Sequence, residues 1–182
     1  FFATLAAALA IPALAFAADS TRPRVLAIHY GLEVNPVTSS YLDHQLQRAQ
    51  DEHYDAAVIV IDTPGGLSES MRKIVKKEIG LRVPVIVFVS PSGSRAASAG
   101  VWITEAADVA AMAPATNIGS STPIDSSGQN LGSDLRRKVI NDAVASLTSL
   151  MRFHGRNAAW AAAAVRKASN LDERRAKAIN VV

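Results

Sequence analysis

A serine between small residues is the first candidate for chemistry in this chain of 182 residues. Ser98 stands in the stretch Ala-Ala-Ser-Ala-Gly, after the apolar run "VPVIVFV" and a turn rich in serine and glycine. Such small neighbours either pack tightly or leave room for another molecule to approach the hydroxyl. Because serine hydroxyls often cap helices, a capping role is the structural alternative. A nucleophilic serine would also need a base that takes its proton.

Histidine is the usual partner of a nucleophilic serine, but the four histidines of this chain fit that role poorly. His29 lies in an expected strand, His44 and His53 lie on or at the end of an expected helix, and His154 stands at a helix end. We interpret all four as surface or packing residues. A lysine can act as the base instead, if burial lowers its pKa from about 10.4 to near 7 or 8.

Lys138 is one candidate for such a lysine. It lies on the helix expected over residues 134–153, where successive residues are about 100° apart around the axis. At that spacing Lys138 falls at the margin of the apolar stripe. The stripe residues are Leu135, Val139, Ala143, Leu147 and Leu150. This position fits a half-buried lysine and an ordinary exposed one equally well.

A second candidate site is the turn "DTPGG", which follows the apolar run Ala56–Ile61. Pro64 ends the strand, and Gly65 and Gly66 free the backbone just before a helix. Backbone N–H groups at such a place can point at an anion or a developing oxyanion. A plain turn between strand and helix is the alternative, since glycines are common there.

The order of elements predicts an α/β fold. Apolar runs predict strands at Val25–Tyr30, Ala56–Ile61, Val83–Val89 and Ala107–Met112. The continuous β-branched run Ala56–Ile61 predicts burial on both faces. Helical spacing predicts helices over 36–53, from the glycine turn to about residue 78, and over 96–106, 134–153, 157–167 and 171–178, with a polar loop over 113–133. Alternating strands and helices favour right-handed βαβ units, and ligands bind such sheets at the carboxyl ends of the strands, where both glycine-rich turns lie.

Composition excludes several kinds of site. The chain has no cysteine, which removes thiol nucleophiles, thiolate metal sites and disulfides. The net charge is +3, and the basic residues near the end interleave with a helical apolar pattern. We interpret them as a solvated helix face, and we expect no nucleic-acid binding, no metal and no cofactor.

The first residues are typical of an exported protein. Residues 1–18 carry no charge and are mostly apolar, and the small-x-small pattern Ala15-Phe16-Ala17 precedes polar residues. We interpret residues 1–18 as a signal peptide without its basic leader, cut after Ala17. A membrane-spanning helix is the alternative, but Pro12 and the short length argue against it.

Five ordered blocks resemble one family. The blocks are "DTPGG", "SRAASAGVWI", "ATNIGSSTPI", "RRKVINDAVASLTSLMRFHGRN" and "NLDERRAKAINVV". Together they resemble the NfeD-type membrane-bound serine proteases, Clp-protease-like Ser–Lys enzymes often associated with stomatin-like proteins. The resemblance runs from about Val25 to Val182. It implies a Clp/crotonase-like fold, with mostly parallel sheets built from βαβ units and flanked by helices, over a protease domain at 24–182 that is truncated at its C-terminal end.

The resemblance also implies residue roles. The serine of the "SAG" block, Ser98, corresponds to the nucleophile, and Lys138 corresponds to the general base. The oxyanion hole would be formed by the backbone N–H groups of Gly66 and Ala99. The substrate-binding residues expected from it are Gly65, Leu67, Asn117, Ile118 and Gly119. The long polar loop over residues 113–133 is expected to border the substrate groove.

The family further implies an endopeptidase that cleaves hydrophobic segments of membrane-associated proteins, with stomatin-like proteins as partners. A homodimer or larger oligomer is expected, at the periplasmic or extracytoplasmic face of a membrane, anchored by a C-terminal part beyond this sequence. One departure is that "AAAAVRKASNL" lacks an acid that could tune the lysine. Two alternatives remain open. One is a catalytically weak, protease-like scaffold for membrane partners, and the other is a crotonase-type acyl-CoA enzyme, for which only Asp62 and Glu69 stand near the glycine turns.

Overall fold

A four-stranded parallel sheet forms the centre of the computed structural model, which describes residues 22–124 and 132–182. Its strands are β1 (Val25–Tyr30), β2 (Ala56–Ile61), β3 (Val85–Val89) and β5 (Val109–Met112), in the order β1-β2-β3-β5. All three pairings are parallel, as the alternation of strands and helices predicted. The expected signal peptide over residues 1–18 lies outside the described residues.

A smaller sheet joins the carboxyl end of the first one. It contains β4 (Arg95–Ala97), β6 (Asn117–Gly119) and β7 (Asn170–Asp172), with β4 and β6 parallel and β6 and β7 antiparallel. A single bridge between Thr63 and Ala96 connects it to the segment after β2. The expectation of mostly parallel sheets is therefore confirmed.

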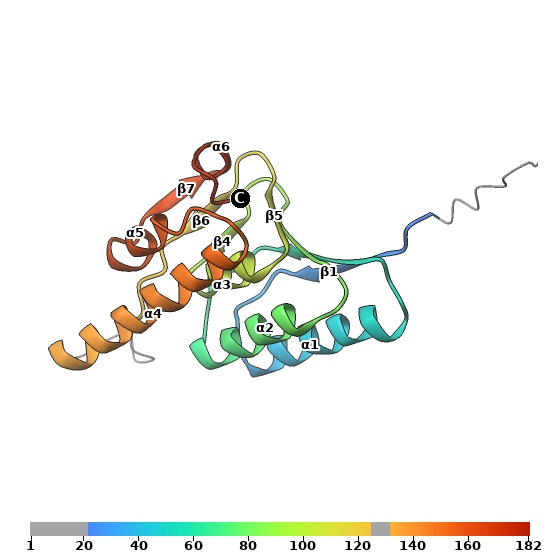
Figure 1. The fold of residues 1–182 in the computed structure, drawn as a ribbon, viewed down its shortest axis with the longest axis horizontal. Helices are drawn as coiled ribbons and strands as arrows, with labels where there is room; N and C mark the ends of the chain where they lie inside the picture. The colour runs from blue at the N-terminus through green and yellow to red at the C-terminus, as the bar shows by residue number, and fades with distance from the viewer. Residues whose placement is uncertain (1–21, 125–131) are drawn as a thin grey trace, which may run out of the picture.

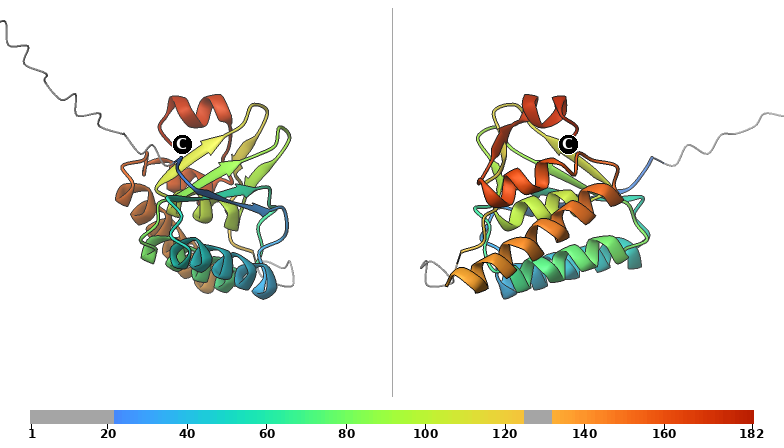
Figure 2. Two further views of the ribbon diagram at one scale, coloured as in Figure 1. Left: turned by 90° about the vertical axis from the view of Figure 1, so that its right-hand side faces the viewer. Right: turned by 60° about the vertical axis from the view of Figure 1, so that its left-hand side comes forward.

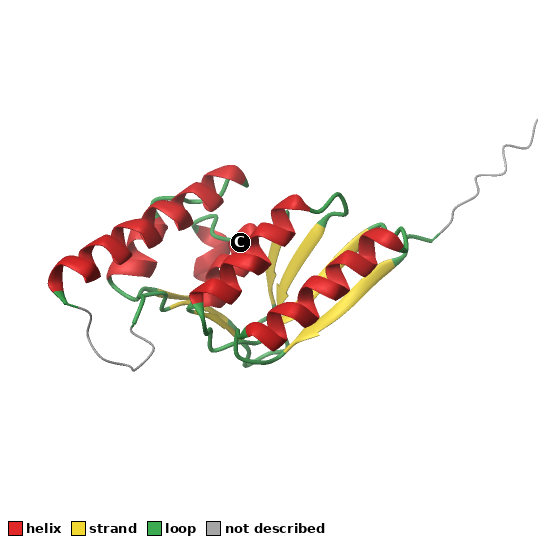
Figure 3. Cartoon of the chain, turned by 90° about the horizontal axis from the view of Figure 1, so that it is seen from below, coloured by secondary structure: helices red, strands yellow, loops and turns green. Residues whose placement is uncertain are grey.

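The described residues form the helices α1 (Pro36–Asp51), α2 (Ser68–Gly80), α3 (Ala99–Ala106), α4 (Ser133–Phe153), α5 (Trp160–Arg166) and α6 (Glu173–Ala178). A layer that contains α1, α2 and α3 covers one face of the parallel sheet, α4 packs on α3, α5 packs on α4, and α6 lies against the small sheet (Figures 1 and 2). Seen from below, the helices stand in front of the strands (Figure 3). The strands present Ile28, Ile59 and Val87 to this layer, and all three are nearly or fully buried. Leu42 and Leu46 of α1 and Ile74 of α2 pack in the same core.

The opposite face of the sheet is only partly covered. In β2 every second residue is fully buried, whereas Val58 and Val60 keep part of their surface exposed, as do their partners Ile86 and Phe88 in β3. The expectation that Ala56–Ile61 is buried on both faces is therefore wrong for one face. In the described residues, helices cover the other face of this parallel sheet. A continuous apolar run therefore predicts that a strand is buried on at least one face, but it does not predict that both faces are buried.

Three short strands replace segments that the sequence predicted differently. The expected helix over 96–106 is β4 followed by α3, the expected loop over 113–133 contains β6, and the expected helix over 171–178 is β7 followed by α6. Strands of three residues carry too little alternation to be recognised, because their pairing partners lie far away in the sequence. The small sheet they form supports the candidate site.

Candidate active site

Ser98 occupies the corner between β4 and α3. Its backbone has φ 52° and ψ −118°, an unfavourable conformation for any residue except glycine. The N–H of Ser98 donates to the carbonyl oxygen of Gly119 at 3.0 Å, and the carbonyl of Ser98 accepts from the N–H of Val101 at 3.0 Å. The side chain makes no capping hydrogen bond to α3, so the alternative of a plain helix cap is wrong. Strained backbone of this kind is typical of functional corners.

Gly65 packs directly against this serine. A Cβ atom at Gly65 would lie 2.4 Å from Cβ and 3.0 Å from Oγ of Ser98, and the φ of Gly65 is +104°. At Gly66, with φ +151°, a Cβ would lie 2.1 Å from the carbonyl oxygen of Val34. Both positions therefore require glycine, because a side chain would collide with the serine or with backbone.

The backbone of the glycine turn leaves one N–H group for a ligand. Val34 donates its N–H to Gly65 and accepts from the N–H of Leu67, both at 2.7 Å. Backbone groups of successive extended residues point in alternate directions, so the N–H of Gly66 points away from Val34. Ala99 is the first residue of α3, where an N–H group has no partner within the helix. Over residues 22–124 and 132–182, neither of these two N–H groups has a recorded acceptor.

Two hollows meet at Ser98. A groove of about 700 Å³ runs between residues 64–68 on one side and Ser120, Thr122 and Ile124 on the other. A smaller pocket of about 70 Å³ opens between α2, α3 and α4. Ser98 and Gly66 line both, and Ala99 lines the smaller pocket. The arrangement can hold an extended chain in the groove and a single side chain in the pocket.

Lys138 lies at the edge of this site rather than inside it. It is exposed on α4, while its neighbours Val139 and Asp142 line the small pocket with Ser98. The apolar stripe is turned from the expected one, since Leu135 is 55% exposed. The buried residues of α4 are Ile140, Ala143, Leu147, Leu150 and Met151. Lys138 therefore sits on the flank of the helix face that borders the pocket.

The expected substrate-binding residues divide into two groups. Gly65 and Leu67 line the groove, and Leu67 is 46% exposed there. Asn117, Ile118 and Gly119 form β6, in which Ile118 is fully buried in the core. Gly119 contacts Ser98 through its carbonyl oxygen. The groove is also bordered by Ser120, Thr122 and Ile124, which follow β6 and lie in the loop expected at this border. The sequence did not single out these three residues within the loop, because β6 itself was not recognised.

A buried arginine ties together the helices that carry Ser98 and Lys138. Arg156, just after α4, donates to the carbonyl oxygens of Thr104, Glu105 and Ala107 at the end of α3. Its guanidinium also lies 3.4 Å from the Glu105 carboxylate, and both side chains are almost completely buried. Burial raises the pKa of Glu105 to about 7, although Arg156 opposes the change. This contact fixes the far ends of α3 and α4 relative to each other.

A buried carboxylic acid lies near this arginine. Burial, with a smaller contribution from Asp108, raises the pKa of Glu78 well above its ordinary value. Neither carboxyl oxygen of Glu78 has a hydrogen-bond partner within the described part of the chain. Glu78 lies near the end of α2 and lines neither of the two hollows at Ser98.

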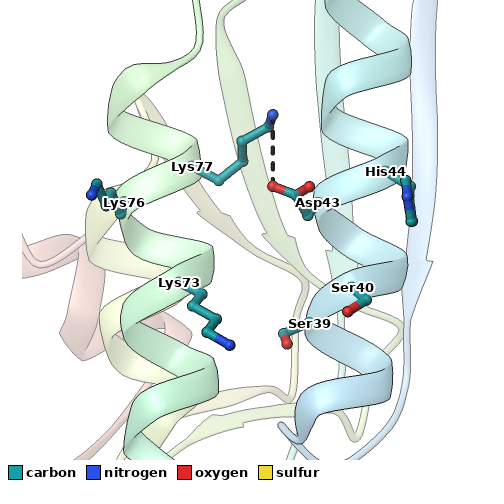
Figure 4. A pocket seen from close by; sticks show the side chains of 7 residues that line it. All are labelled: Ser39, Ser40, Asp43, His44, Lys73, Lys76 and Lys77. Atoms are coloured by element: carbon teal, nitrogen blue, oxygen red, sulfur yellow. Dashed lines mark ion pairs between the residues drawn. The ribbon is translucent and has the colours of Figure 1, made fainter.

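A further hollow of about 510 Å³ lies between α1 and α2 (Figure 4). Lys77 is already engaged there, because its Nζ donates to Gln47 at 2.6 Å and lies 3.6 Å from Asp43. Lys76 and His44 point away from the gap in Figure 4. These side chains do not converge on a common point, so the corner at Ser98 remains the stronger candidate.

No group of three metal-ligating side chains gathers anywhere in residues 22–124 and 132–182. The helices within these same ranges are all too short or too polar to cross a bilayer.

Comparison with solved structures identifies the fold. The chain superposes with a TM-score of 0.82 on the 1510-N membrane-bound stomatin-specific protease in a serine-to-alanine variant, at 30% identity over 88% of this chain and 78% of that one. A lysine-to-alanine variant of the same protease, in complex with a substrate peptide, gives a TM-score of 0.82 at 29% identity over 89% and 74%. ClpP1 from Listeria monocytogenes shares the fold alone, with a TM-score of 0.70 at 18% identity over 86% and 88%. The chain has a ClpP-like protease fold.

Comparison of the sequence identifies the family. Residues 24–182 match the family described as the N-terminal domain of NfeD1b, and the chain belongs to this family. It is 37% identical over 128 residues to the membrane-bound protease PH1510 of Pyrococcus horikoshii, covering 69% of this chain and 29% of that protein. It is 32% identical over 111 residues to the membrane protein NfeD1b of Bacillus subtilis, covering 61% and 25%. The chain thus spans under a third of the length of either relative.

Proposed function

We propose that this chain is a serine endopeptidase in which Ser98 is the nucleophile and Lys138 the general base. The single observation that carries the proposal is the strained corner of Ser98 against Gly65, at the meeting point of a groove and a pocket. A hydroxyl held there, with two backbone N–H groups free beside it, suits attack on a peptide carbonyl. The solved relatives add support, because a serine variant and a lysine variant of a stomatin-specific protease share this fold.

The reaction proceeds through an acyl-enzyme. Neutral Lys138 accepts the hydroxyl proton while Oγ of Ser98 bonds to the substrate carbonyl carbon. The negative charge on the substrate oxygen is held by the N–H groups of Gly66 and Ala99. The C–N bond breaks as the leaving amine takes the proton from Lys138, and a water activated by the same lysine then releases the acyl group.

A general base accepts a proton, so Lys138 acts in its neutral form. Its flexible four-carbon stem can bring Nζ from the flank of α4 toward the groove. Bound substrate would cover the ammonium group there, and loss of water favours the neutral form. The rate is therefore expected to rise with pH as the lysine deprotonates in the complex.

The substrates we propose are hydrophobic segments of membrane-associated proteins, with a stomatin-like protein as the partner. The support is that the similar 1510-N protein is a stomatin-specific protease, together with the apolar walls of the small pocket. We further propose that residues 1–18 direct export. The domain would then act at the extracytoplasmic face of a membrane, as a dimer or larger oligomer.

The test is cleavage of a fluorogenic peptide rich in apolar residues, compared between the wild type, Ser98→Ala and Lys138→Ala across pH 6 to 10. Loss of cleavage in both variants, with a rising alkaline limb in the wild type, supports the dyad. A serine-reactive phosphonate should label the wild type at Ser98. Full activity in Lys138→Ala would overturn the role of that lysine, and an unlabelled, inactive wild type that still binds its partner would favour a scaffold.

A further inference from the structure

An ion pair stands at the small pocket beside Ser98. Nη2 of Arg72 on α2 donates to Oδ2 of Asp142 on α4 at 2.5 Å, and both residues line the pocket. Their side chains are 51% and 65% exposed, so the pair lies at the mouth rather than the floor. It joins α2 to α4 across the opening.

The rest of the pocket is apolar or small. Met71, Trp102, Val139 and Ala143 supply apolar walls, and the serines around them carry no charge. Arg72 and Asp142 are therefore the charged groups that a side chain entering the pocket would meet. In the wild type they neutralise each other.

The pocket fits one particular residue of a substrate, given the proposed function. Gly66, Ser98 and Ala99 all line it, and these are the groups proposed to hold and attack the scissile carbonyl. The side chain attached to the Cα next to that carbonyl carbon starts only two bonds away from it. The pocket therefore takes the residue on the acyl side of the scissile bond.

We propose that Arg72 and Asp142 determine the charge of the side chain that this pocket accepts. While Arg72 and Asp142 are paired, neither is available to bind a charged substrate side chain. Such a side chain would lose its hydration on entering the pocket without gaining an ion pair, so apolar side chains are favoured. If Arg72 is neutralised, the Asp142 carboxylate is left facing the pocket and attracts a basic side chain. If Asp142 is neutralised, the Arg72 guanidinium attracts an acidic one. Because exposed ion pairs contribute little to stability, all these variants should fold.

The test is a set of three peptides that differ only on the acyl side of the scissile bond, carrying leucine, lysine or glutamate. We expect the wild type to cleave the leucine peptide best. Arg72→Gln should raise kcat/KM for the lysine peptide about 10-fold relative to the leucine peptide, and Asp142→Asn should do the same for the glutamate peptide. The double variant Arg72→Gln/Asp142→Asn should return to the leucine preference.

Arg48→Gln is the matched control, because it removes the Arg48–Glu52 ion pair of α1, which does not line the pocket. It should keep the wild-type preference. Identical preferences in all five proteins would overturn the assignment while leaving the proposed protease intact. A wild type that neither cleaves these peptides nor reacts with a serine-directed phosphonate would overturn both.

Discussion

At the scale of residues, the backbone corner at Ser98 depends on the absence of a side chain at Gly65. Gly65 has φ +104°, and a methyl group there would lie 2.4 Å from Cβ of Ser98. Only a hydrogen atom fits between the two backbones. The small residues around Ser98 thus serve tight packing on this side, and on the other side they leave the hydroxyl open to the groove.

We expect Gly65→Ala to reduce peptidase activity at least about 100-fold, because the serine must shift away from the amides that hold the oxyanion. Its folding should also weaken, by about 1 kcal/mol or more, because alanine is strained at this φ. Gly80→Ala is the control, since no atom lies within 4 Å of the added methyl group. Activity and urea unfolding of both variants check the prediction, and wild-type activity in Gly65→Ala would contradict it.

The sequence predicted part of this site for clear reasons. Ser98 and the glycine turn follow neighbouring strands, and a parallel sheet brings the carboxyl ends of its strands together. Lys138 was harder to place, because a residue at the margin of a helical stripe turns toward or away from the site with a small rotation. The loop that contains Ser120 and Thr122 was expected at the groove, but the two residues could not be singled out within it, because their position depends on β6, which pairs with residues about fifty positions later.

At the scale of elements, the ends of α3 and α4 are joined by Arg156. Its bonds to Thr104, Glu105 and Ala107 satisfy carbonyl groups that a helix end leaves without partners. Ser98 precedes the first residue of α3, so the Arg156 contacts lie at the opposite end of this helix from the proposed nucleophile. Sequence patterns did not reveal these contacts, since an arginine in a turn is usually exposed.

The buried Glu105 should make stability depend on pH. The pKa of Glu105 is about 7 in the folded chain and near 4.5 in the unfolded chain, so the folded state binds this proton more tightly. The stabilisation of the folded state that results is complete below pH 4.5 and is lost as the pH rises through 7. The free energy of unfolding of the wild type should therefore fall relative to Glu105→Gln between pH 5 and 8, by up to about 3 kcal/mol. Chemical denaturation of both proteins at several pH values measures the difference.

Neighbouring ionisable groups are the same in the wild type and in Glu105→Gln, so the difference between the two proteins reports on Glu105. Glu78 has a raised pKa and His154 a lowered one, while Asp108 and Arg156 stand nearby, but both proteins contain all four. Glu52→Gln, which removes an exposed carboxylate of the α1 ion pair, should follow the wild-type curve. Parallel curves for the wild type and Glu105→Gln would show that Glu105 is already ionised at pH 5.

At the scale of the whole molecule, the helices leave one face of the parallel sheet partly open. Val58, Val60, Ile86 and Phe88 lie on that face with part of their apolar surface exposed. Contiguous apolar surface of this kind commonly marks an interface. The strand order was predictable from the alternation of elements, but the coverage of each face depends on where the later helices pack.

We expect the chain to form a dimer or larger oligomer through this open face. Val60→Glu should shift the mass measured by light scattering toward the monomer, because a carboxylate would then be buried without a partner. Lys76→Glu, on the opposite side of the sheet in α2, is the control and should keep the wild-type mass. A wild type that is monomeric at high concentration would contradict the prediction, as would an oligomer unaffected by Val60→Glu.

The hydrogen bond from Ser98 to Gly119 also has a consequence for biosynthesis. β6, which contains Gly119, is paired along its other edge with β7, and Ser120 donates its N–H to the carbonyl of Ser169. The strand whose Gly119 accepts the hydrogen bond from Ser98 is thus held by β7, which lies about seventy positions after Ser98 in the sequence. A nascent chain carries Ser98 long before β7 has been made, so we expect the corner at Ser98 to reach its final geometry only after synthesis has passed β7.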